Sequence, residues 1–277
     1  MSGAAQQVSA SVAPLDLAAL ESTLHESIFA GKLHHFAEIG STNTHAMQAG
    51  AAGAPHGSVY VADAQTAGRG RGAHQWASPA GSGLYVSVLL RPSLAPGDAL
   101  WLSLAAGLAA IDAIAETTGY TPDLRWPNDL MAGHRKLGGI LTEMQAEATR
   151  VRFVVIGIGI NVHQDFFPPE LAARATSLAI ECLDRAPART AVLAALLPAL
   201  EREVNALTSS DPTAAQQALV QRVELQSTWA RGKHVAVGEE HPFQGVTEGL
   251  DSRGFLRVRT PDGTLRTVLS GGVREQE

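Results

Sequence analysis

The sequence predicts a chain of mixed helices and strands that ends in a small antiparallel β-barrel. Segments rich in β-branched and aromatic residues predict strands at 57–62, 84–90 and 151–162. Apolar side chains at steps of three and four residues predict one long helix over 98–119. After Trp229 the chain changes to short strands separated by turn signals, which predicts a barrel of about 45 residues.

Further helices are expected around these strands. A modest helical pattern runs from Leu17 to about Ile28, and a leucine-rich stripe predicts a helix from about Ala188 to Leu207. Asp211-Pro212 marks another helix start, because proline is favoured in the first helical turn. Asp98 is the expected N-cap of the long helix.

These features divide the 277 residues into three parts. They are a loose N-terminal lead (1–16), a main domain (17–231) and the small C-terminal barrel domain (232–277). Hydrophobic residues make up 45% of the chain and charged residues 17%, so long disordered segments are not expected to dominate. The chain is long enough to bury a large core, so it does not need disulfides or metal ions for stability.

Charge and cysteine content exclude several classes of protein. The net charge of −6 argues against a general nucleic-acid coat protein, because such proteins carry an excess of lysine and arginine. The single cysteine, Cys182, excludes an internal disulfide and a cysteine-cluster metal site. The N-terminal residues lack the basic and apolar regions of a signal peptide. We therefore expect a soluble, cytoplasmic protein.

The first candidate site is the glycine- and arginine-rich segment 68–72, with Gln65 before it and Trp76 after it. Glycines let backbone N–H groups turn toward an anion, and Arg69 and Arg71 offer forked donors for phosphate or carboxylate. A solvated basic turn or an RGG-type nucleic-acid segment would look similar. The flanking strands and the acidic protein favour a small anionic ligand. We expect the free loop 66–76 to be mobile, because its glycines and arginines have no apolar contacts to hold them.

The second candidate joins two expected strands, at about 122–126 and 137–146. Pro127 ends the first strand because it has no N–H for the ladder, which places Asn128 and Asp129 at a turn. Lys136 precedes the second strand, where the paired glycines Gly138 and Gly139 would let a ligand approach the backbone. Taken singly these residues suit an ordinary turn, but an acid, a lysine and paired glycines together indicate a site.

Two further segments place amides beside these candidates. The segment 157–162 ends an apolar strand at Asn161, which either caps a turn or points an amide at a ligand. It lacks the third glycine of a dinucleotide-binding fingerprint, and no Walker A motif occurs in the chain. Ser41-Thr42-Asn43 most often caps a helix, here over 44–52, but can also bind a neutral polar ring.

Together these segments, in this order, resemble the biotin protein ligase family (biotin–[acetyl-CoA-carboxylase] ligase). The similarity covers roughly 35–275, and the five ordered motifs are specific where GRGRG alone would not be. The small C-terminal domain, closing at 269–273, resembles that of the family. The matching segments are STNTHA (41–46), AQTAGRGRGAHQWASPAGSGLYVS (64–87), RWPNDLM (125–131), RKLGGILTE (135–143) and VIGIGINV (155–162).

The resemblance implies a fold and a reaction. The fold is α+β, with a mixed, largely antiparallel sheet flanked by helices, akin to class II aminoacyl-tRNA synthetases, and a C-terminal SH3-like β-barrel. The reaction uses biotin, ATP and Mg²⁺ to form biotinoyl-5′-AMP. The acyl group then passes to a lysine of the biotin carboxyl carrier domain of a biotin-dependent carboxylase. The sequence leaves open whether the chain forms a homodimer.

The same resemblance implies roles for individual residues. The implied catalytic residues are Arg69, Arg71, Asp129 and Lys136. The implied biotin-binding residues are Ser41, Thr42, Asn43, Gln65, Arg69, Gly70, Arg71, Lys136, Gly138 and Gly139. The implied ATP-binding residues are Arg69, Arg71, Trp76, Asn128, Lys136 and Asn161. Asp129 is also the candidate for orienting Mg²⁺ or the incoming lysine amine.

The chain departs from the family pattern at two positions. Arg125 stands where lysine is common, which preserves charge but not a titratable amine. Gly272 stands where an acidic residue is usual, which weakens any specific contact there. About 40 residues precede the first motif, so we expect a monofunctional ligase without an N-terminal DNA-binding domain and without specific DNA binding.

Other functions compete with this interpretation. A lipoate–protein ligase shares the catalytic fold, although the 68–72 loop, Trp76 and the RWPND segment favour biotin. A non-catalytic biotin-binding regulator would be expected to have lost Lys136 or the arginines. An RGG-type RNA-binding module is third, because the charge of the chain does not support it.

Overall fold

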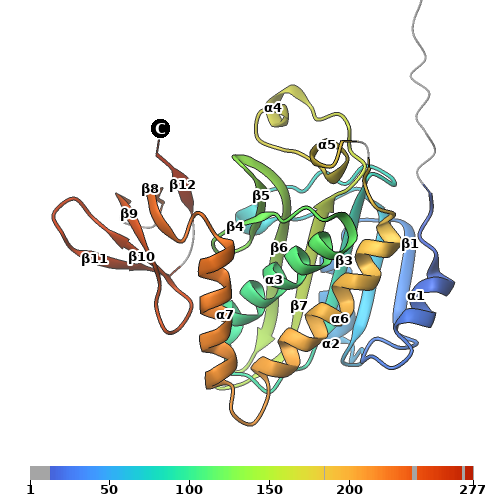
Figure 1. Ribbon diagram of the computed structural model, residues 1–277. Coiled ribbons are helices and arrows are strands. Elements are labelled where there is room, and N and C mark those ends of the chain that lie inside the picture. The colour runs from blue at the N-terminus through green and yellow to red at the C-terminus, as the bar shows by residue number, and fades with distance from the viewer. Residues whose placement is uncertain (1–12, 184, 239–241, 270–271, 277) are drawn as a thin grey trace, which may run out of the picture.

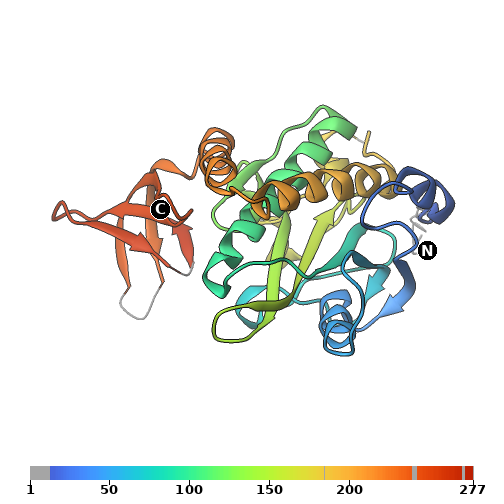
Figure 2. The same cartoon turned by 90° about the horizontal axis from the view of Figure 1, so that it is seen from below.

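A large mixed sheet carries helices on both faces, and a small separate sheet follows it (Figure 1). In the view from below, α3 (Ala99–Thr118) and α6 (Arg189–Leu207) cover one face, and α2 (Thr42–Ala51) covers the other (Figure 2). This computed structural model describes residues 13–183, 185–238, 242–269 and 272–276. The predicted loose lead at 1–16 therefore lies mostly outside the described residues.

The large sheet has seven strands and is mostly antiparallel, as the resemblance implied. Among its described pairings only β1 with β2 is parallel. From edge to edge the strands are β1 (Leu33–Ile39), β2 (Ser58–Gln65), β3 (Gly83–Leu90), β7 (Val151–Asn161), β6 (Arg135–Ala146), β5 (Asp129–Ala132) and β4 (Asp123–Arg125).

Two strands of this sheet were not predicted from the sequence. β1 has only partly buried and exposed side chains, so it lacks the apolar alternation that marks a half-buried strand. β5 has four residues and begins at Asp129, where a turn was predicted. That turn is shorter than expected, because Asp129 already pairs with Arg125 on one side and Gly139 on the other.

The other predicted helices differ from prediction mainly at their ends, and two four-residue helices, α4 (Pro169–Ala172) and α5 (Leu178–Glu181), were not predicted. The first, α1, ends at Thr23 rather than near Ile28, and α7 begins at Thr213 with Pro212 at its N-cap. Arg222 on α7 forms ion pairs with Asp112 of α3 and Glu203 of α6, which ties the three helices together. The bounds are α1 (Leu17–Thr23), α4 (Pro169–Ala172), α5 (Leu178–Glu181) and α7 (Thr213–Gln226), with 3₁₀ turns at Arg71–Ala73 and Pro96–Asp98.

The long helix α3 is the centre of the core. Its side chains from Trp101 to Ile114 are almost all buried against the sheet and α6. With the preceding turn it is long and apolar enough to cross a membrane, but 72% of that stretch is buried inside the fold, as in the core helix of a soluble protein. It ends at Gly119, whose φ of 72° favours glycine. Asp98 stands at the N-cap position, as predicted, but it also ends a 3₁₀ turn and makes no side-chain cap hydrogen bond.

The C-terminal strands form one five-stranded antiparallel sheet. Within the described residues no pairing joins its edge strands β11 and β12, so the closed barrel that was predicted is not detected. In sheet order the strands are β11 (Leu265–Val268), β10 (Leu256–Arg259), β9 (Phe243–Leu250), β8 (Arg231–Val237) and β12 (Val273–Glu275).

A buried hydrogen bond joins the two sheets. Trp126, which follows β4, donates its indole N–H to the backbone carbonyl of Gly254 at 2.9 Å. Gly254 has a φ of 81° and sits so close to α3 that a Cβ there would lie 3.0 Å from Leu104 and 3.1 Å from Trp101. The turn between β9 and β10 therefore packs directly onto the core helix.

Replacing Trp126 with phenylalanine should lower the free energy of unfolding by about 1–3 kcal/mol, because the buried Gly254 carbonyl loses its donor. Urea denaturation measures this. Trp76→Phe is the matched control, since the buried indole nitrogen of Trp76 has no hydrogen-bond partner to lose. Equal midpoints for the two variants would contradict the role of the Trp126 bond.

Candidate active site

A cavity of about 520 Å³ lies between the large sheet and the segment 68–76. Its walls come from the start of α2, the end of β2, the turn after β4 and the centres of β6 and β7. The fold thus gathers every predicted site residue except Gly138 and Asn161. The predicted residues that line the cavity are Ser41, Thr42, Asn43, Gln65, Arg69, Gly70, Arg71, Trp76, Asn128, Asp129, Lys136 and Gly139.

Three glycines on the paired central strands leave room for the functional side chains. A Cβ on Gly157 would lie 2.5 Å from Asn43 Oδ1, and one on Gly159 would lie 2.7 Å from the indole of Trp76. A Cβ on Gly139, the partner of Gly159 in the ladder, would meet Lys136 at 3.1 Å. Bare backbone at these points lets Asn43, Trp76 and Lys136 lie against the sheet.

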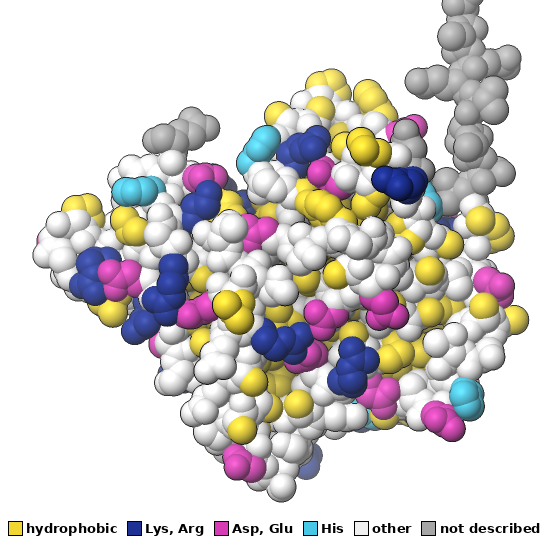
Figure 3. All heavy atoms as spheres, viewed as in Figure 1, with side chains coloured by type: hydrophobic (Ala, Val, Ile, Leu, Met, Phe, Trp, Pro, Cys, Tyr) yellow, Lys and Arg dark blue, Asp and Glu magenta, His cyan; other side chains and the backbone are white. Residues whose placement is uncertain are grey.

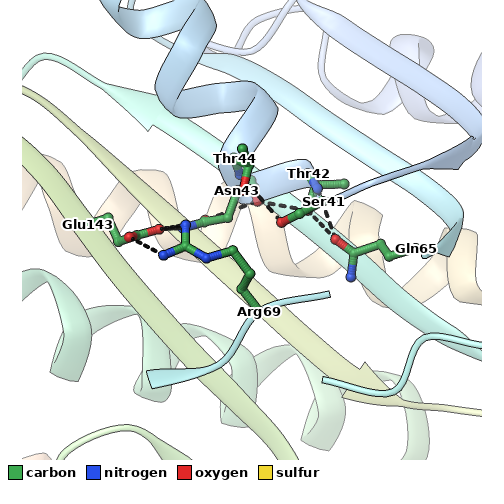
Figure 4. A network of polar contacts seen from close by, with 8 residues as sticks. Ser41, Thr42, Asn43, Thr44, Gln65, Arg69 and Glu143 are labelled. Atoms are coloured by element: carbon green, nitrogen blue, oxygen red, sulfur yellow. Dashed lines mark hydrogen bonds and ion pairs between the residues drawn. The ribbon is translucent and has the colours of Figure 1, made fainter. Parts of the chain in front are cut away.

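The first turn of α2 supplies the neutral polar end of the cavity (Figure 4). Ser41 caps the helix, and its hydroxyl accepts the Thr44 N–H. Thr42 donates its backbone N–H and its hydroxyl to Gln65 Oε1, at 2.9 and 3.1 Å. The same segment therefore caps the helix and lines the cavity. Ser41, Thr42 and Asn43 are buried although they are polar, so their hydrogen bonds fix their directions.

A carboxylate between two cations forms the charged part of the site. Asp129 Oδ1 lies 2.5 Å from Lys136 Nζ, and Asp129 Oδ2 accepts hydrogen bonds from Arg125. Burial alone would raise the pKa of Asp129, but Lys136 and Arg125 outweigh it and hold that pKa below its usual value. Arg125 also packs over the ring of Trp229, with its guanidinium carbon 5.3 Å from the ring centroid. Asp129 thus stays ionised and orients Lys136 toward the cavity.

Arg69 and Arg71, for which similar roles were expected, have different partners in the structure. Arg71 Nη1 lies 3.5 Å from Asn128 Oδ1, and burial lowers the pKa of Arg71 although Asp129 opposes that shift. Arg69 instead forms a forked ion pair with Glu143, with both N–O distances at 2.8 Å. Arg71 therefore faces the charged part of the site, while Arg69 is bound to the sheet.

The segment 68–76 is held by polar contacts. The Trp76 N–H donates to the Gly68 carbonyl at 2.9 Å, and the Gly70 N–H donates to the His74 carbonyl at 2.7 Å. The Trp76 ring lies near Gly159, with Lys136 Nζ 5.5 Å from its centroid. The reason given for mobility, a lack of apolar contacts, thus overlooked the ion pair and the main-chain bonds that hold this loop.

Two predicted site residues have other surroundings. Asn161 is buried and donates its amide to the Thr176 carbonyl at 2.9 Å, which holds the segment before α5 against β7. A Cβ on Gly138 would meet the Gly159 carbonyl and Leu130, so this glycine permits close strand packing. In this structure neither residue lines the cavity.

The sequence analysis missed several residues beside the site. Glu143, Ser78 and Ser87 all hydrogen-bond residues that line the cavity. For Glu143 a signal existed, because alternate residues of a strand share a face and Gly139 and Leu141 both line the cavity. Ser78 and Ser87 carried no comparable signal.

The small C-terminal sheet also reaches the cavity. Gly238, Gly272 and Arg274 are among its lining residues, and the Gly238 N–H donates to the Gly272 carbonyl at 3.0 Å. Gly272 stands where the resemblance leads us to expect an acidic side chain, so it contributes only backbone here.

Comparison with known proteins agrees with this geometry. Residues 36–161 match the biotin/lipoate A/B protein ligase family, and residues 232–273 match the biotin protein ligase C-terminal domain. The chain is 39% identical over 241 residues to the biotin--[acetyl-CoA-carboxylase] ligase of Mycobacterium tuberculosis, which covers 85% of each protein. This chain belongs to the biotin protein ligase family.

Other biotin ligases match over shorter stretches or by structure. The bifunctional ligase/repressor BirA of Bacillus spizizenii is 46% identical over 153 residues, which is 53% of this chain and 47% of that protein. The chain thus spans about half of that relative. A biotin protein ligase from Aquifex aeolicus, solved with biotin and ATP, has a TM-score of 0.76 and 28% identity, covering 89% of this chain and 100% of that one.

The site of this biotin ligase family member does not fit a resident Mg²⁺ ion at Asp129. Both carboxylate oxygens already bind cationic side chains, and a metal ion there would have to displace Lys136 or Arg125. Within the described residues no group of three or more metal-ligating side chains occurs. Asp129 is better explained as the residue that holds Lys136 in place.

Replacing Gly159 with alanine should displace Trp76, because the new methyl group would lie 2.7 Å from the indole. We expect tryptophan fluorescence to become more accessible to acrylamide. Gly139→Ala is the matched control on the neighbouring strand, where the flexible end of Lys136 can yield at 3.1 Å. Equal quenching in both variants would show that Trp76 does not depend on the bare backbone at Gly159.

Proposed function

We propose that this chain uses ATP to join biotin to a lysine of a biotin carboxyl carrier domain through biotinoyl-5′-AMP. The observation that carries the proposal is one cavity that combines neutral hydrogen-bonding groups with the cations Lys136 and Arg71. Such a cavity suits a substrate with an uncharged polar ring at one end and a carboxylate at the other. The Aquifex aeolicus relative was solved with biotin and ATP, which supports the same pair of substrates.

In the first step a carboxylate oxygen of biotin attacks the α-phosphorus of ATP, and pyrophosphate leaves with the electrons of the broken bond. The two reactants are both anions, so their approach requires positive charge. Lys136 would bridge the carboxylate and the α-phosphate, and Arg71 would stabilise the charge that develops on the phosphate oxygens. Asp129 keeps the Lys136 ammonium in position before the substrates arrive. Mg²⁺ would enter with ATP, bound to its phosphate oxygens.

The neutral end of the cavity would hold the ureido ring of biotin. Ser41, Thr42, Asn43 and Gln65 supply amide and hydroxyl groups there, and all four line the cavity. A buried ureido group needs partners for its carbonyl oxygen and both N–H groups, because each unpaired group costs about 1–3 kcal/mol. Trp76 would then close the site near the adenine, and Asn128 would contact the nucleotide.

In the second step the neutral amine of a carrier lysine attacks the acyl carbon, and AMP leaves. The amine loses its proton to solvent, since the depressed pKa of Asp129 makes this carboxylate a poor base. The relatives from Mycobacterium tuberculosis and Paracoccus denitrificans are named as biotin--[acetyl-CoA-carboxylase] ligases, so we propose a carboxylase carrier as the partner.

We also propose a cytoplasmic location and no specific DNA binding, and the charge pattern of one face of the protein supports the second of these proposals. On the face that carries α3, α6 and α7, basic side chains lie beside acidic ones rather than in one basic stripe (Figure 3). A DNA-binding face would concentrate lysine and arginine. Whether the chain forms a homodimer stays open.

Exchange of labelled pyrophosphate into ATP tests the first step directly. We expect exchange with biotin, and none with lipoate or without an acid. Exchange with lipoate alone would overturn the substrate and favour a lipoate–protein ligase. Biotin binding without exchange would favour a non-catalytic regulator.

Replacing Lys136 with alanine should lower biotin-dependent exchange by about 10²–10³-fold, because one charge-stabilising donor is lost. Thermal unfolding would show that the fold persists. Lys233→Ala is the matched control: this lysine pairs with Glu275 on the small sheet and should leave exchange unchanged. Near-normal exchange in the Lys136 variant would refute the role assigned to it.

A further inference from the structure

Glu143 on β6 binds two functional segments at once (Figure 4). Its carboxylate accepts two hydrogen bonds from Arg69 of the 68–76 loop, both at 2.8 Å. Its Oε2 also accepts from the side-chain amide of Asn43, in the first turn of α2, at 2.5 Å. One side chain of the sheet therefore joins the loop above the cavity to the helix at its neutral end.

The contact with Asn43 decides which way its amide points. A carboxylate can only accept hydrogen bonds, so the NH₂ group of Asn43 must face Glu143. Asn43 Oδ1 then lies near Ser87, whose hydroxyl is 3.2 Å away, and over the bare backbone of Gly157. Asn43 lines the cavity, and because Glu143 binds its NH₂ group, the amide oxygen is the group left to accept from a ligand N–H.

A second series of hydrogen bonds runs from Ser87 to the 68–76 loop. The Ser87 hydroxyl also lies 2.9 Å from Thr42 Oγ1, and Thr42 donates to Gln65. Gln65 Nε2 donates to Ser78 Oγ at 2.8 Å, and Ser78 in turn donates to the Trp76 carbonyl at 3.1 Å. Both ends of the loop are thus attached to one polar network, at Arg69 and beside Trp76.

We propose that Glu143 is a positioning residue that couples the placement of the 68–76 loop to the orientation of Asn43. The proposal rests on the function proposed above in one respect only, the identity of biotin as the ligand that Asn43 meets. Through Glu143, loop closure and recognition of a ligand N–H become parts of one event. A ligand that changes the orientation of Asn43 would therefore also change the placement of the loop.

An isolated surface ion pair would carry no such role. Exposed pairs contribute little because water screens them and two flexible chains must be ordered. The Arg69–Glu143 pair differs because two Arg69 nitrogens bind the carboxylate, the Glu143 side chain is only 27% exposed, and a third donor shares the carboxylate. Arg259 and Glu248 form a similar two-bond ion pair on the small sheet, and neither residue lines the cavity.

Hydrogen exchange of the ligand-free protein tests the connection to the loop without any assay of activity. Glu143→Gln preserves the shape of the side chain but removes its charge, and Arg69→Gln removes the other partner. We expect each variant to raise amide exchange over residues 66–78 by about tenfold, and the double variant to raise it no further. Glu248→Gln, the matched control, should leave this segment unchanged.

Kinetics of pyrophosphate exchange test the connection to Asn43. We expect Glu143→Gln to raise the KM for biotin by about tenfold and the KM for ATP by less, because the variant releases both Asn43 and the loop, and only the loop residues Arg71 and Trp76 meet ATP. A general loss of structure would instead lower kcat and the melting temperature and affect both substrates.

The two measurements fail separately. Unchanged loop exchange in Glu143→Gln, or additive effects in the double variant, would overturn the proposal whatever the enzyme assays show. Equal rises in both KM values would also overturn it. Absence of biotin-dependent exchange in the unmodified protein would instead refute the proposed function, and the loop measurement would still decide whether Glu143 holds the loop.

Discussion

The site depends on a constraint on two neighbouring strands: β6 and β7 must pack into the core on one face and carry no side chain at Gly139, Gly157 and Gly159 on the other. On the packed face Ile156, Ile158 and Ile160 enter the core with α3. On the cavity face Gly157 and Gly159 leave space for Asn43 and Trp76. The alternation of a β-strand makes both faces possible in one run of residues. A side chain at Gly157 or Gly159 would occupy the space of Asn43 or Trp76.

Two of the positive charges of the site are held in place by one carboxylate. The protein is acidic overall, with a net charge of −6, yet Lys136 and Arg71 meet at one cavity. Asp129 makes this arrangement stable, since it pairs with Lys136 and with Arg125. Arg125 in turn packs on Trp229, just before the small sheet. The lysine therefore sits in a chain of contacts that runs from the cavity to the C-terminal sheet, and arginine suits this place because its planar head can bind a carboxylate and cover a ring at once.

The ligand-free loop shows what composition leaves out. Its glycines and arginines led us to expect a mobile segment, and that mobility stays a prediction. The loop is nevertheless attached at Arg69 by Glu143 and near Trp76 by Ser78. Arg69 and Glu143 are 74 residues apart, so the local sequence could not show their contact. Trp76 and Ser78 are only 2 residues apart.

Much of this molecule could be predicted from local sequence. Strands at 58–65, 83–90 and 151–161, the helix α3 and the cap at Ser41 follow from patterns within a few residues, where propensity and spacing act directly. The ordered motifs likewise predicted the residues that meet at the cavity. The tertiary structure alone decided the partners. Asp129 binds Lys136 and Arg125, Arg69 binds Glu143, and Asn161 donates to the Thr176 carbonyl. Among the described residues no strand pairing closes the small sheet. These outcomes depend on contacts between distant segments, which pack according to shape and charge that no single segment contains.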